Sequence, residues 1–458
     1  MRKPYLCAIA FGVALFIGSS SCKKTEGEYR EFLQDPELYH ASVKQLTDII
    51  VHDIFSPPVA SRIYVYPNIA AYEVMVQKYP EYLSLAGQVN GLKAVPRPDP
   101  DKPLDLHLSA LHAFLTVGKA MIFSEETMDA YREEVYKKIQ ATDIPEDIFD
   151  NSLQYGETVA AHILKWAGED NYKQTRSFPK YTIRSEAGYW KPTPPDYMEG
   201  IEPHWMKIRT LALDSCNQFA PLPPHPFNME KGSPFHTEVM EVYEIGKKLN
   251  EGKTEIAKFW DCNPYVSHHH GHAMFAAKKI TPGGHWMGIT SIACKKSKAS
   301  LPKTVEAYTR VSIALFDGFI SCWDEKWRSI VVRPETVINE YVDEDWIPLL
   351  QTPPFPEYTS GHSVISNASA TVLTDLFGEP FRFTDTTEEE YGLPARTFNS
   401  FREAGEEAAI SRLYAGIHYR RAIEEGVKQG KKVGEWVVAK VQTERDALSG
   451  KVKKEFSE

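Results

Sequence analysis

The chain has few cysteines, no long apolar run beyond its N-terminal segment and no surplus of basic residues. Its 458 residues include 52 Lys and Arg against 62 Asp and Glu, which gives a formal net charge of −10. Binding to DNA or RNA needs a dense basic face that neutralises phosphates, so this balance disfavours nucleic acid as a partner. With 42% hydrophobic and 25% charged residues, the chain is typical of a globular protein with a substantial core.

The six cysteines are widely spaced and form neither a Cys-x-x-Cys pair nor a zinc-finger pattern. Cys7 lies in an N-terminal apolar segment and Cys22 follows that segment directly. The other four are Cys216, Cys262, Cys294 and Cys322. Export would allow disulfides, and we expect either buried free thiols or one structural bridge.

The N-terminus has the pattern of a targeting segment. Arg2 and Lys3 precede an apolar stretch, residues 5–17, that is shorter than the roughly 20 residues of a membrane span. Small residues then lead to Cys22, as in a bacterial lipobox, with Ser19 in place of the usual Leu. We expect residues 1–21 to be a signal peptide and Cys22 to carry lipid. The protein would then be exported and anchored to a bilayer at the periplasmic or cell-surface side. A plain signal peptide cut near the serines is the alternative.

Helical periodicity dominates the remaining chain, which predicts an all-α fold built from helical bundles. Apolar residues recur at steps of three and four in residues 104–122, 128–139, 148–166, 239–249, 305–323, 364–377, 401–415 and 427–441. A small hairpin is expected at 181–189. We expect an N-terminal helical region at 23–299, a core domain at 300–440 and a polar tail at 441–458.

Three irregular stretches interrupt the helices, residues 95–103, residues 191–227 and residues 351–360, the last of which leads into a motif described below. The second is rich in proline and aromatic residues and has no clear period. Long irregular segments inside a helical domain are often functional.

A first candidate motif contains Lys326 and Arg333, followed by Pro334. Seven residues turn a helix by about 700°, so the two cations would project from nearly one face and could hold the same anion. Pro334 places Arg333 at the end of the helix. An exposed basic stripe is the ordinary alternative.

A second motif, Thr359-Ser360-Gly361-His362, opens an apolar helical stretch. Unpaired backbone N–H groups at a helix start attract anions. Gly361 lets the backbone approach a ligand, Ser360 adds a hydroxyl, and His362 can move a proton near neutral pH. A capping turn with an incidental histidine is the alternative.

The third motif is Ser411-Arg412, followed after five residues by His418. An unbroken helix would turn Arg412 and His418 about 120° apart. We expect Gly416 to end the helix and return His418 to the site. Three cations, a small-residue turn and two histidines are the groups that a tetrahedral oxyanion such as phosphate or vanadate requires.

With these motifs in this order, the chain resembles the superfamily of phosphatidic acid phosphatase type 2 and the vanadium-dependent haloperoxidases. The matching residues are Lys326, Arg333, Pro334, Ser360, Gly361, His362, Ser411, Arg412 and His418. Segments around Trp323 and Phe355 look like the vanadium chloroperoxidases, which places the likeness closest to the haloperoxidase branch. The resemblance implies two four-helix bundles with the anion site in the C-terminal one.

The resemblance also implies the roles of these residues. In a haloperoxidase, His418 would be the axial ligand of vanadate, His362 the acid–base group, and Trp323 and Phe355 part of a halide pocket. Lys326, Arg333, Ser360, Gly361 and Arg412 would hold the oxyanion. Peroxide and halide would be the substrates.

Two other functions use the same residues. In a phosphatase without a cofactor, His418 would attack the phosphorus of a phosphomonoester and His362 would protonate the leaving group. A lipid-anchored protein that binds an oxyanion without turnover is the third possibility.

The chain departs from the family pattern at two positions. Thr359 replaces a proline, which we expect to change loop stiffness more than chemistry. Ala422 stands where the family has an Asp that orients the ligand histidine, and loss of such a group typically costs 10- to 100-fold in affinity or activity. Glu424 and Glu425 are candidates to replace it.

Four histidines lie within the five residues His268-His269-His270-Gly-His272. Adjacent side chains diverge and no carboxylate or thiolate accompanies them at a known metal-site spacing. We therefore expect a wall of the anion pocket or a surface loop rather than a metal site.

Overall fold

The structure is a computed structural model that describes residues 27–445 except residue 271. The predicted signal peptide and Cys22 lie outside the described residues, as does most of the predicted polar tail. The helices are α1 (Glu28–Gln34), α2 (Pro36–His52), α3 (Pro57–Met75), α4 (Leu106–Lys119), α5 (Glu125–Gln140), α6 (Glu146–Gly168), α7 (Tyr172–Thr175), α8 (Pro234–Lys247), α9 (Glu251–Phe259), α10 (Pro282–Ser297), α11 (Leu301–Ser329), α12 (Pro334–Tyr341), α13 (Gly361–Phe377), α14 (Phe401–Tyr414) and α15 (Arg420–Lys440). Two 3-10 turns, η1 (Trp205–Lys207) and η2 (Glu389–Tyr391), and four strands, β1 (Tyr265–His270), β2 (Ala273–Lys278), β3 (Phe383–Asp385) and β4 (Arg396–Phe398), complete the described elements.

The predicted all-α class is confirmed, because the described strands form only two short antiparallel hairpins, β1–β2 and β3–β4. Each predicted helical segment overlaps a helix and extends at most three residues beyond its ends, and local signals set the observed ends. Asp105 caps α4 by accepting from the backbone N–H groups of His107 and Leu108. Gly378, at φ +82°, ends α13 where a side chain would be strained.

The predicted hairpin at 181–189 is wrong. That segment is irregular and makes one isolated bridge, from Tyr189 to Val331. The longer hairpin is β1–β2, in the histidine-rich segment. Helix α3 had no visible period because nearly every one of its residues is buried, so it has no polar face that would reveal a helix.

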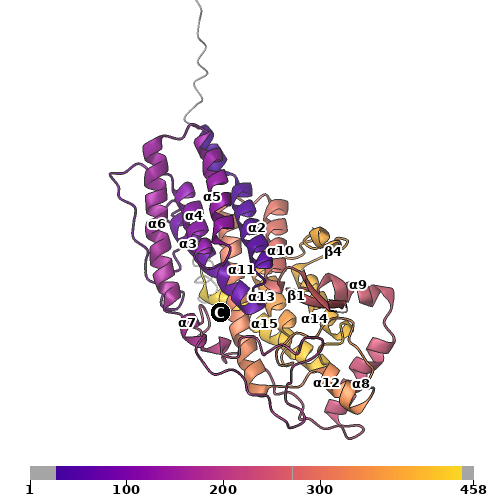
Figure 1. Ribbon diagram of the computed structural model, residues 1–458. Coiled ribbons are helices and arrows are strands. Elements are labelled where there is room, and N and C mark those ends of the chain that lie inside the picture. The colour runs from indigo at the N-terminus through magenta and orange to yellow at the C-terminus, as the bar shows by residue number, and fades with distance from the viewer. Residues whose placement is uncertain (1–26, 271, 446–458) are drawn as a thin grey trace, which may run out of the picture.

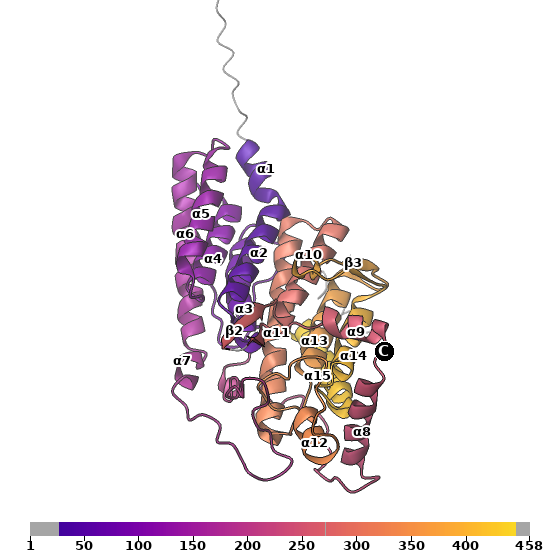
Figure 2. The same ribbon diagram turned by 45° about the vertical axis from the view of Figure 1, so that its right-hand side comes forward.

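The helices pack in two groups that α11 joins (Figure 1). Helix α4 packs between α3 and α6 on the N-terminal side, and α13 packs between α14 and α15 on the C-terminal side. Helix α11, 29 residues long, contacts α3 and α10 as well as α13 and α15. Figure 2 shows α8 and α12 at the end of the molecule away from α1. Whether these groups are the two four-helix bundles of the family stays a prediction.

The contact between α13 and α15 depends on three glycines of α15. A Cβ on Gly430 would lie 2.1 Å from the carbonyl oxygen of Val364, and one on Gly434 would lie 2.7 Å from that of Ala368. Gly426 packs beside Ser360 and Ser363 at the start of α13. The backbones therefore approach closely, and this contact positions the start of α13, where His362 lies.

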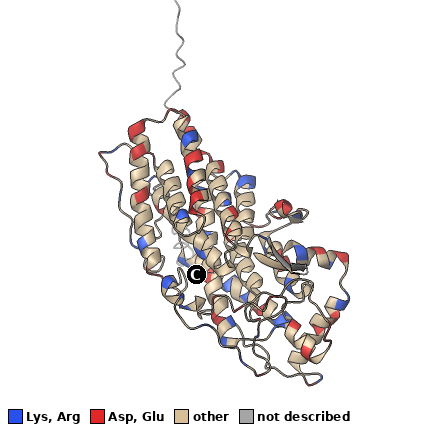
Figure 3. Cartoon of the chain, in the orientation of Figure 1, with Lys and Arg blue, Asp and Glu red and all other residues tan. Residues whose placement is uncertain are grey.

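Acidic and basic residues are interspersed along the outer helices in the view of Figure 3. Among the described helices, none is long and apolar enough to cross a membrane.

Candidate active site

Lys326 and Arg333 do not share one helix, so that part of the sequence prediction is wrong. Helix α11 ends at Ser329, Ile330 turns the chain with φ +50°, and Arg333 is the N-cap of α12 with Pro334 as its first residue. The two cations still converge. The Lys326 Nζ and the Arg333 Cζ each lie 5.0 Å from the centroid of the Phe355 ring.

Helix α13 begins at the second motif, as predicted. Ser360 is its N-cap, and the Ser360 Oγ accepts a hydrogen bond of 3.3 Å from the Ser363 N–H. Gly361 is the first helical residue. A Cβ on Gly361 would meet only Trp323, at 3.7 Å, so it would project into free space beside that ring.

The third motif also behaves as predicted. Helix α14 carries Arg412 and ends at Tyr414, and Gly416, at φ +81°, reverses the chain. His418 then lies just before α15, with its Nε2 3.2 Å from the Arg333 Nη1.

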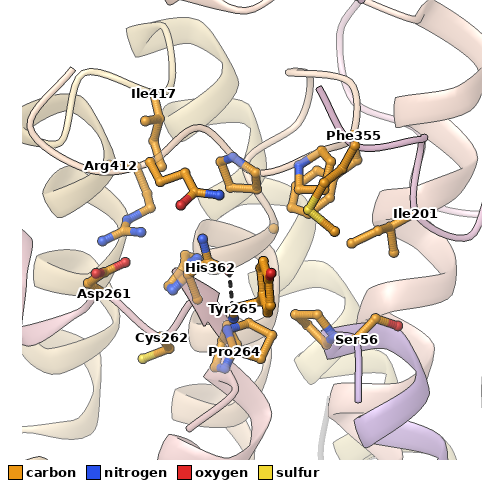
Figure 4. Close-up of a pocket in the computed structure, with 18 of the residues that line it drawn as sticks. Ser56, Ile201, Asp261, Cys262, Pro264, Tyr265, Phe355, His362, Arg412 and Ile417 are labelled. Atoms are coloured by element: carbon orange, nitrogen blue, oxygen red, sulfur yellow. Dashed lines mark hydrogen bonds between the residues drawn. The ribbon is translucent and has the colours of Figure 1, made fainter. Parts of the chain in front are cut away.

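The motifs meet at a cavity of about 160 Å³ (Figure 4). Six of the predicted site residues line it: Trp323, Phe355, Gly361, His362, Arg412 and His418. Lys326 and Arg333 lie directly behind Phe355 and His418. Ser360 lies behind Gly361 and does not line the cavity.

The described part of the site holds three buried cations. Burial lowers the pKa of Lys326 to about 7 and that of Arg333 to about 10. Burial also lowers the pKa of Arg412, while Asp261 raises it. Figure 4 shows the Arg412 side chain extended toward Asp261. Buried charge is costly without a partner, so the cluster favours an anion.

Some donors of the cluster lack a protein partner. The Lys326 ammonium donates to the carbonyl oxygens of Pro356 and Glu357, which uses two of its three N–H groups. The Arg333 Nη2 and the His362 Nε2 are buried without a hydrogen bond. The free N–H groups of Lys326 and Arg333 fit a ligand that accepts several hydrogen bonds, which a tetrahedral oxyanion does, and the His362 Nε2 can exchange a proton with such a ligand.

Both histidines are neutral at neutral pH. Burial lowers the pKa of His418 well below its usual value, and Arg333 and Lys326 lower it further. Burial and Arg412 have the same effect on His362. A neutral imidazole can offer a lone pair to a metal centre or accept a proton.

Glu357 is the functional residue that sequence reasoning missed. Its Oε1 accepts from the His418 Nδ1 at 2.8 Å and from the Tyr419 backbone N–H at 2.9 Å. With Nδ1 donating to Glu357, the lone pair is on Nε2, the nitrogen next to Arg333. Burial raises the pKa of Glu357 to about 8, although Arg333 and Lys326 lower it. His418 therefore has a carboxylate partner even though Ala422 has none to offer.

Neither Glu424 nor Glu425 is the carboxylate partner of His418. Glu425 accepts from the Leu222 N–H and pairs with Lys428, and Glu424 is exposed and lies 3.9 Å from Arg420. In the sequence, the only feature that pointed to a role for Glu357 was its position in the segment around Phe355, between two site motifs.

The irregular segment at 191–227 also contributes to the site. Met198 and Ile201 line the cavity, and Figure 4 shows Ile201 on the side opposite Arg412. Asp317 of α11 anchors the segment, because its carboxylate accepts from the backbone N–H groups of residues 211–213. The expectation that this irregular stretch is functional agrees with its position.

The histidine-rich segment follows a cavity residue. Tyr265, at the start of β1, lines the cavity, and His272 is exposed. The side chains of residues 268–270 are not among those described. Cys216, Cys262, Cys294 and Cys322 are free thiols. The expectation of buried free thiols holds for Cys262, Cys294 and Cys322, whereas Cys216 is only half-buried.

The chain is similar to known proteins along most of its length. Residues 306–447 match a family model described as the second helical-bundle domain of VCPO. The crystal structure of the first bacterial vanadium-dependent iodoperoxidase is 51% identical in sequence with a TM-score of 0.85, and the match covers 89% of this chain and 97% of that one. No curated protein matches the chain.

Two more distant structures share the fold. The holo form of a bacterial vanadium-dependent chloroperoxidase is 15% identical, with a TM-score of 0.65 over 85% of this chain and 93% of that one. The corresponding apo form is 14% identical, with a TM-score of 0.63 over 84% and 95%.

The site is a buried cluster of cations and neutral histidines on an all-α scaffold. The chain belongs to the vanadium-dependent haloperoxidases, and it is an enzyme of that superfamily. The predicted family, haloperoxidase branch and helical fold are thereby confirmed.

Proposed function

We propose that this haloperoxidase holds vanadate in the cavity and oxidises iodide with hydrogen peroxide. The observation that carries the proposal is the pair of unpaired buried polar atoms, the donor Arg333 Nη2 and the His362 Nε2, beside a neutral His418. The relative that shares 51% sequence identity is an iodoperoxidase, which favours iodide among the halides.

The cations and the helix start would bind the oxyanion. Lys326, Arg333 and Arg412 neutralise its negative charge, and the Gly361 N–H donates from the start of α13. Ser360 stabilises the start of α13, because its Oγ accepts a hydrogen bond from the Ser363 N–H. The His418 Nε2 supplies the protein ligand, and Glu357 fixes its orientation through Nδ1.

Bound vanadate would supply the centre at which peroxide is activated for halide oxidation. The overall reaction consumes iodide, hydrogen peroxide and one proton and yields hypoiodous acid and water. His362 is neutral and its Nε2 is free, so it can take a proton from the incoming peroxide and return it to the departing oxygen.

Trp323 and Phe355 form one wall of the cavity, with ring centroids 5.0 Å apart. Lys326 lies within 6 Å of both rings. An apolar wall backed by cations suits a large, weakly hydrated anion, and we assign it to the halide.

A paired assay separates this proposal from the phosphatase alternative. Purified protein receives orthovanadate, peroxide and iodide, bromide or chloride in one arm, and a phosphomonoester without vanadate in the other. We expect iodide oxidation and little hydrolysis, because the relative that shares 51% sequence identity is an iodoperoxidase. Robust hydrolysis without halide oxidation would support the phosphatase, and neither activity would support a binding protein.

We also propose export and lipid anchoring, on the basis of the N-terminal pattern and Cys22 alone. Cys22→Ala should move the protein from the membrane fraction to the soluble fraction. Unchanged membrane association of that variant would contradict the lipid anchor.

A further inference from the structure

A second cluster of polar side chains lies beside the cavity and has no part in the proposed reaction. It contains Cys262 between α9 and β1, His285 in the first turn of α10, and Glu388 just before η2. All three are at most 1% exposed. We propose that these three side chains bind a divalent metal ion, with Zn²⁺ as the ion that their chemistry favours.

The spacing of the three ligand atoms carries the proposal. The His285 Nδ1 lies 3.4 Å from the Cys262 Sγ and 3.1 Å from the Glu388 Oε1, and Sγ and Oε1 are 3.8 Å apart. Tetrahedral Zn²⁺, with bonds of about 2.0–2.3 Å, separates such atoms by about 3.4–3.6 Å. The three atoms therefore need to move only by about 0.3 Å to share one ion.

The surroundings of His285 match a metal ligand. Its Nε2 lies 2.7 Å from the Asp385 Oδ2, and Asp385 is held in turn by the Thr387 N–H. A carboxylate on the far nitrogen fixes the tautomer in which Nδ1 offers its lone pair to a metal. Trp260 stacks on the imidazole at 4.6 Å between centroids and fixes the ring plane.

The ligand set determines which ion fits. One thiolate, one imidazole and one carboxylate suit a borderline-soft ion such as Zn²⁺ better than Mg²⁺ or Ca²⁺, which take oxygen ligands. Three protein ligands leave a fourth position open. Cys262 also lines the cavity, which provides an entry path for the ion and a water molecule to fill that position.

Charge is conserved when the ion enters. Without metal, a protonated His285 would sit between Glu388 and Asp385 beside a neutral thiol. One divalent cation replaces the thiol proton and the Nδ1 proton, so the net charge of the buried cluster does not change. The ion would then connect three parts of the chain: the segment that contains Asp261, helix α10 and the turn after β3. Asp261 in turn faces Arg412.

Cobalt substitution tests the proposal independently of haloperoxidase activity. The full-length protein is treated with a chelator, dialysed and titrated with Co²⁺, and its absorption is recorded. A thiolate ligand produces a charge-transfer band in the near ultraviolet that histidine ligands do not. Any Co²⁺ held by the histidine-rich segment is thus distinguished, because that segment has no thiol.

We expect one thiolate-bound Co²⁺ per chain, displaced by Zn²⁺. Cys262→Ser should abolish the band, and Asp385→Asn should weaken Co²⁺ binding about 10- to 100-fold. Cys294→Ser, which removes a buried thiol elsewhere on α10, is the matched control and should leave the band unchanged.

A Glu388→Gln variant covers the case in which Cys262→Ser does not fold, and it should bind Co²⁺ more weakly than the wild type. Absence of the thiolate band in the wild type at saturating Co²⁺ would overturn the proposal, as would a band that survives in a folded Cys262→Ser variant. Either result would leave a cluster held by protons and hydrogen bonds alone.

Discussion

Glu357→Gln removes the charge from the partner of His418 and keeps its shape. The wild-type carboxylate accepts from the His418 Nδ1 at 2.8 Å, and the amide oxygen of Gln can accept the same bond without a negative charge. A carboxylate partner raises the basicity of the ligand histidine, and its loss typically costs 10- to 100-fold in affinity, or about 1.4–2.7 kcal/mol. We therefore expect vanadate to bind Glu357→Gln about 10- to 100-fold more weakly.

The deficit should depend on pH. Burial raises the pKa of Glu357 to about 8, so below about pH 7 the wild-type carboxyl is largely protonated and neutral, like the amide. Above about pH 8 only the wild type presents a charge to Nδ1. The difference between the two proteins should thus be largest above about pH 8 and shrink at lower pH.

The assay is the vanadate concentration that gives half-maximal iodide oxidation in chelator-treated protein, measured across this pH range. Glu424→Gln and Glu425→Gln are the matched controls, because each removes a carboxylate from the start of α15 without a bond to His418. Equal vanadate affinity of Glu357→Gln and the wild type above about pH 8 would refute the reasoning. A larger loss in either control would also refute it.

Three further predictions concern other parts of the molecule. Burial lowers the pKa of Lys326 to about 7, so Lys326 loses its positive charge as the pH rises through 7. Binding of sulfate, whose own charge is constant near neutral pH, should therefore weaken over this range. Calorimetric titration should show this loss of affinity in the wild type and a smaller loss in Lys326→Arg. Gly430→Ala should lower the free energy of unfolding by about 1–3 kcal/mol or more, because its Cβ would lie 2.1 Å from a backbone oxygen; Gly252→Ala, in an open part of α9, should be neutral or stabilising in the same denaturation experiment. Ala422→Asp should not strengthen vanadate binding, because Glu357 already occupies the His418 Nδ1; a tighter vanadate titration curve for this variant would contradict that account.

The site motifs were predictable because each is a local pattern. Ser360 and Gly361 mark a helix start, and Gly416 marks a helix end, so the chemistry of the short segments is visible in the sequence. The error over Lys326 and Arg333 has a local cause as well. Ile330 takes a positive φ, which is unusual for a β-branched residue, and no sequence rule would place a helix end there.

Other features depend on tertiary contacts. Glu357 reaches His418 across 61 positions, and nothing in the spacing links them. The second cluster brings together Cys262, His285 and Glu388 from three separate segments. The wide spacing of the cysteines argued only against metal sites formed by cysteines close in sequence, and it says nothing about a cluster of this kind. Burial on all sides hid α3, because a helix without a polar face has no periodic signal.

The central claim is that the three motifs form one vanadate site with His418 as its protein ligand. The most direct test titrates chelator-treated protein with orthovanadate and follows iodide oxidation by peroxide. The account predicts negligible activity without vanadate, saturation at one vanadate per chain, and no recovery at any vanadate concentration in His418→Ala. Iodide oxidation that does not depend on vanadate, or that persists in a folded His418→Ala variant at saturating vanadate, would contradict it.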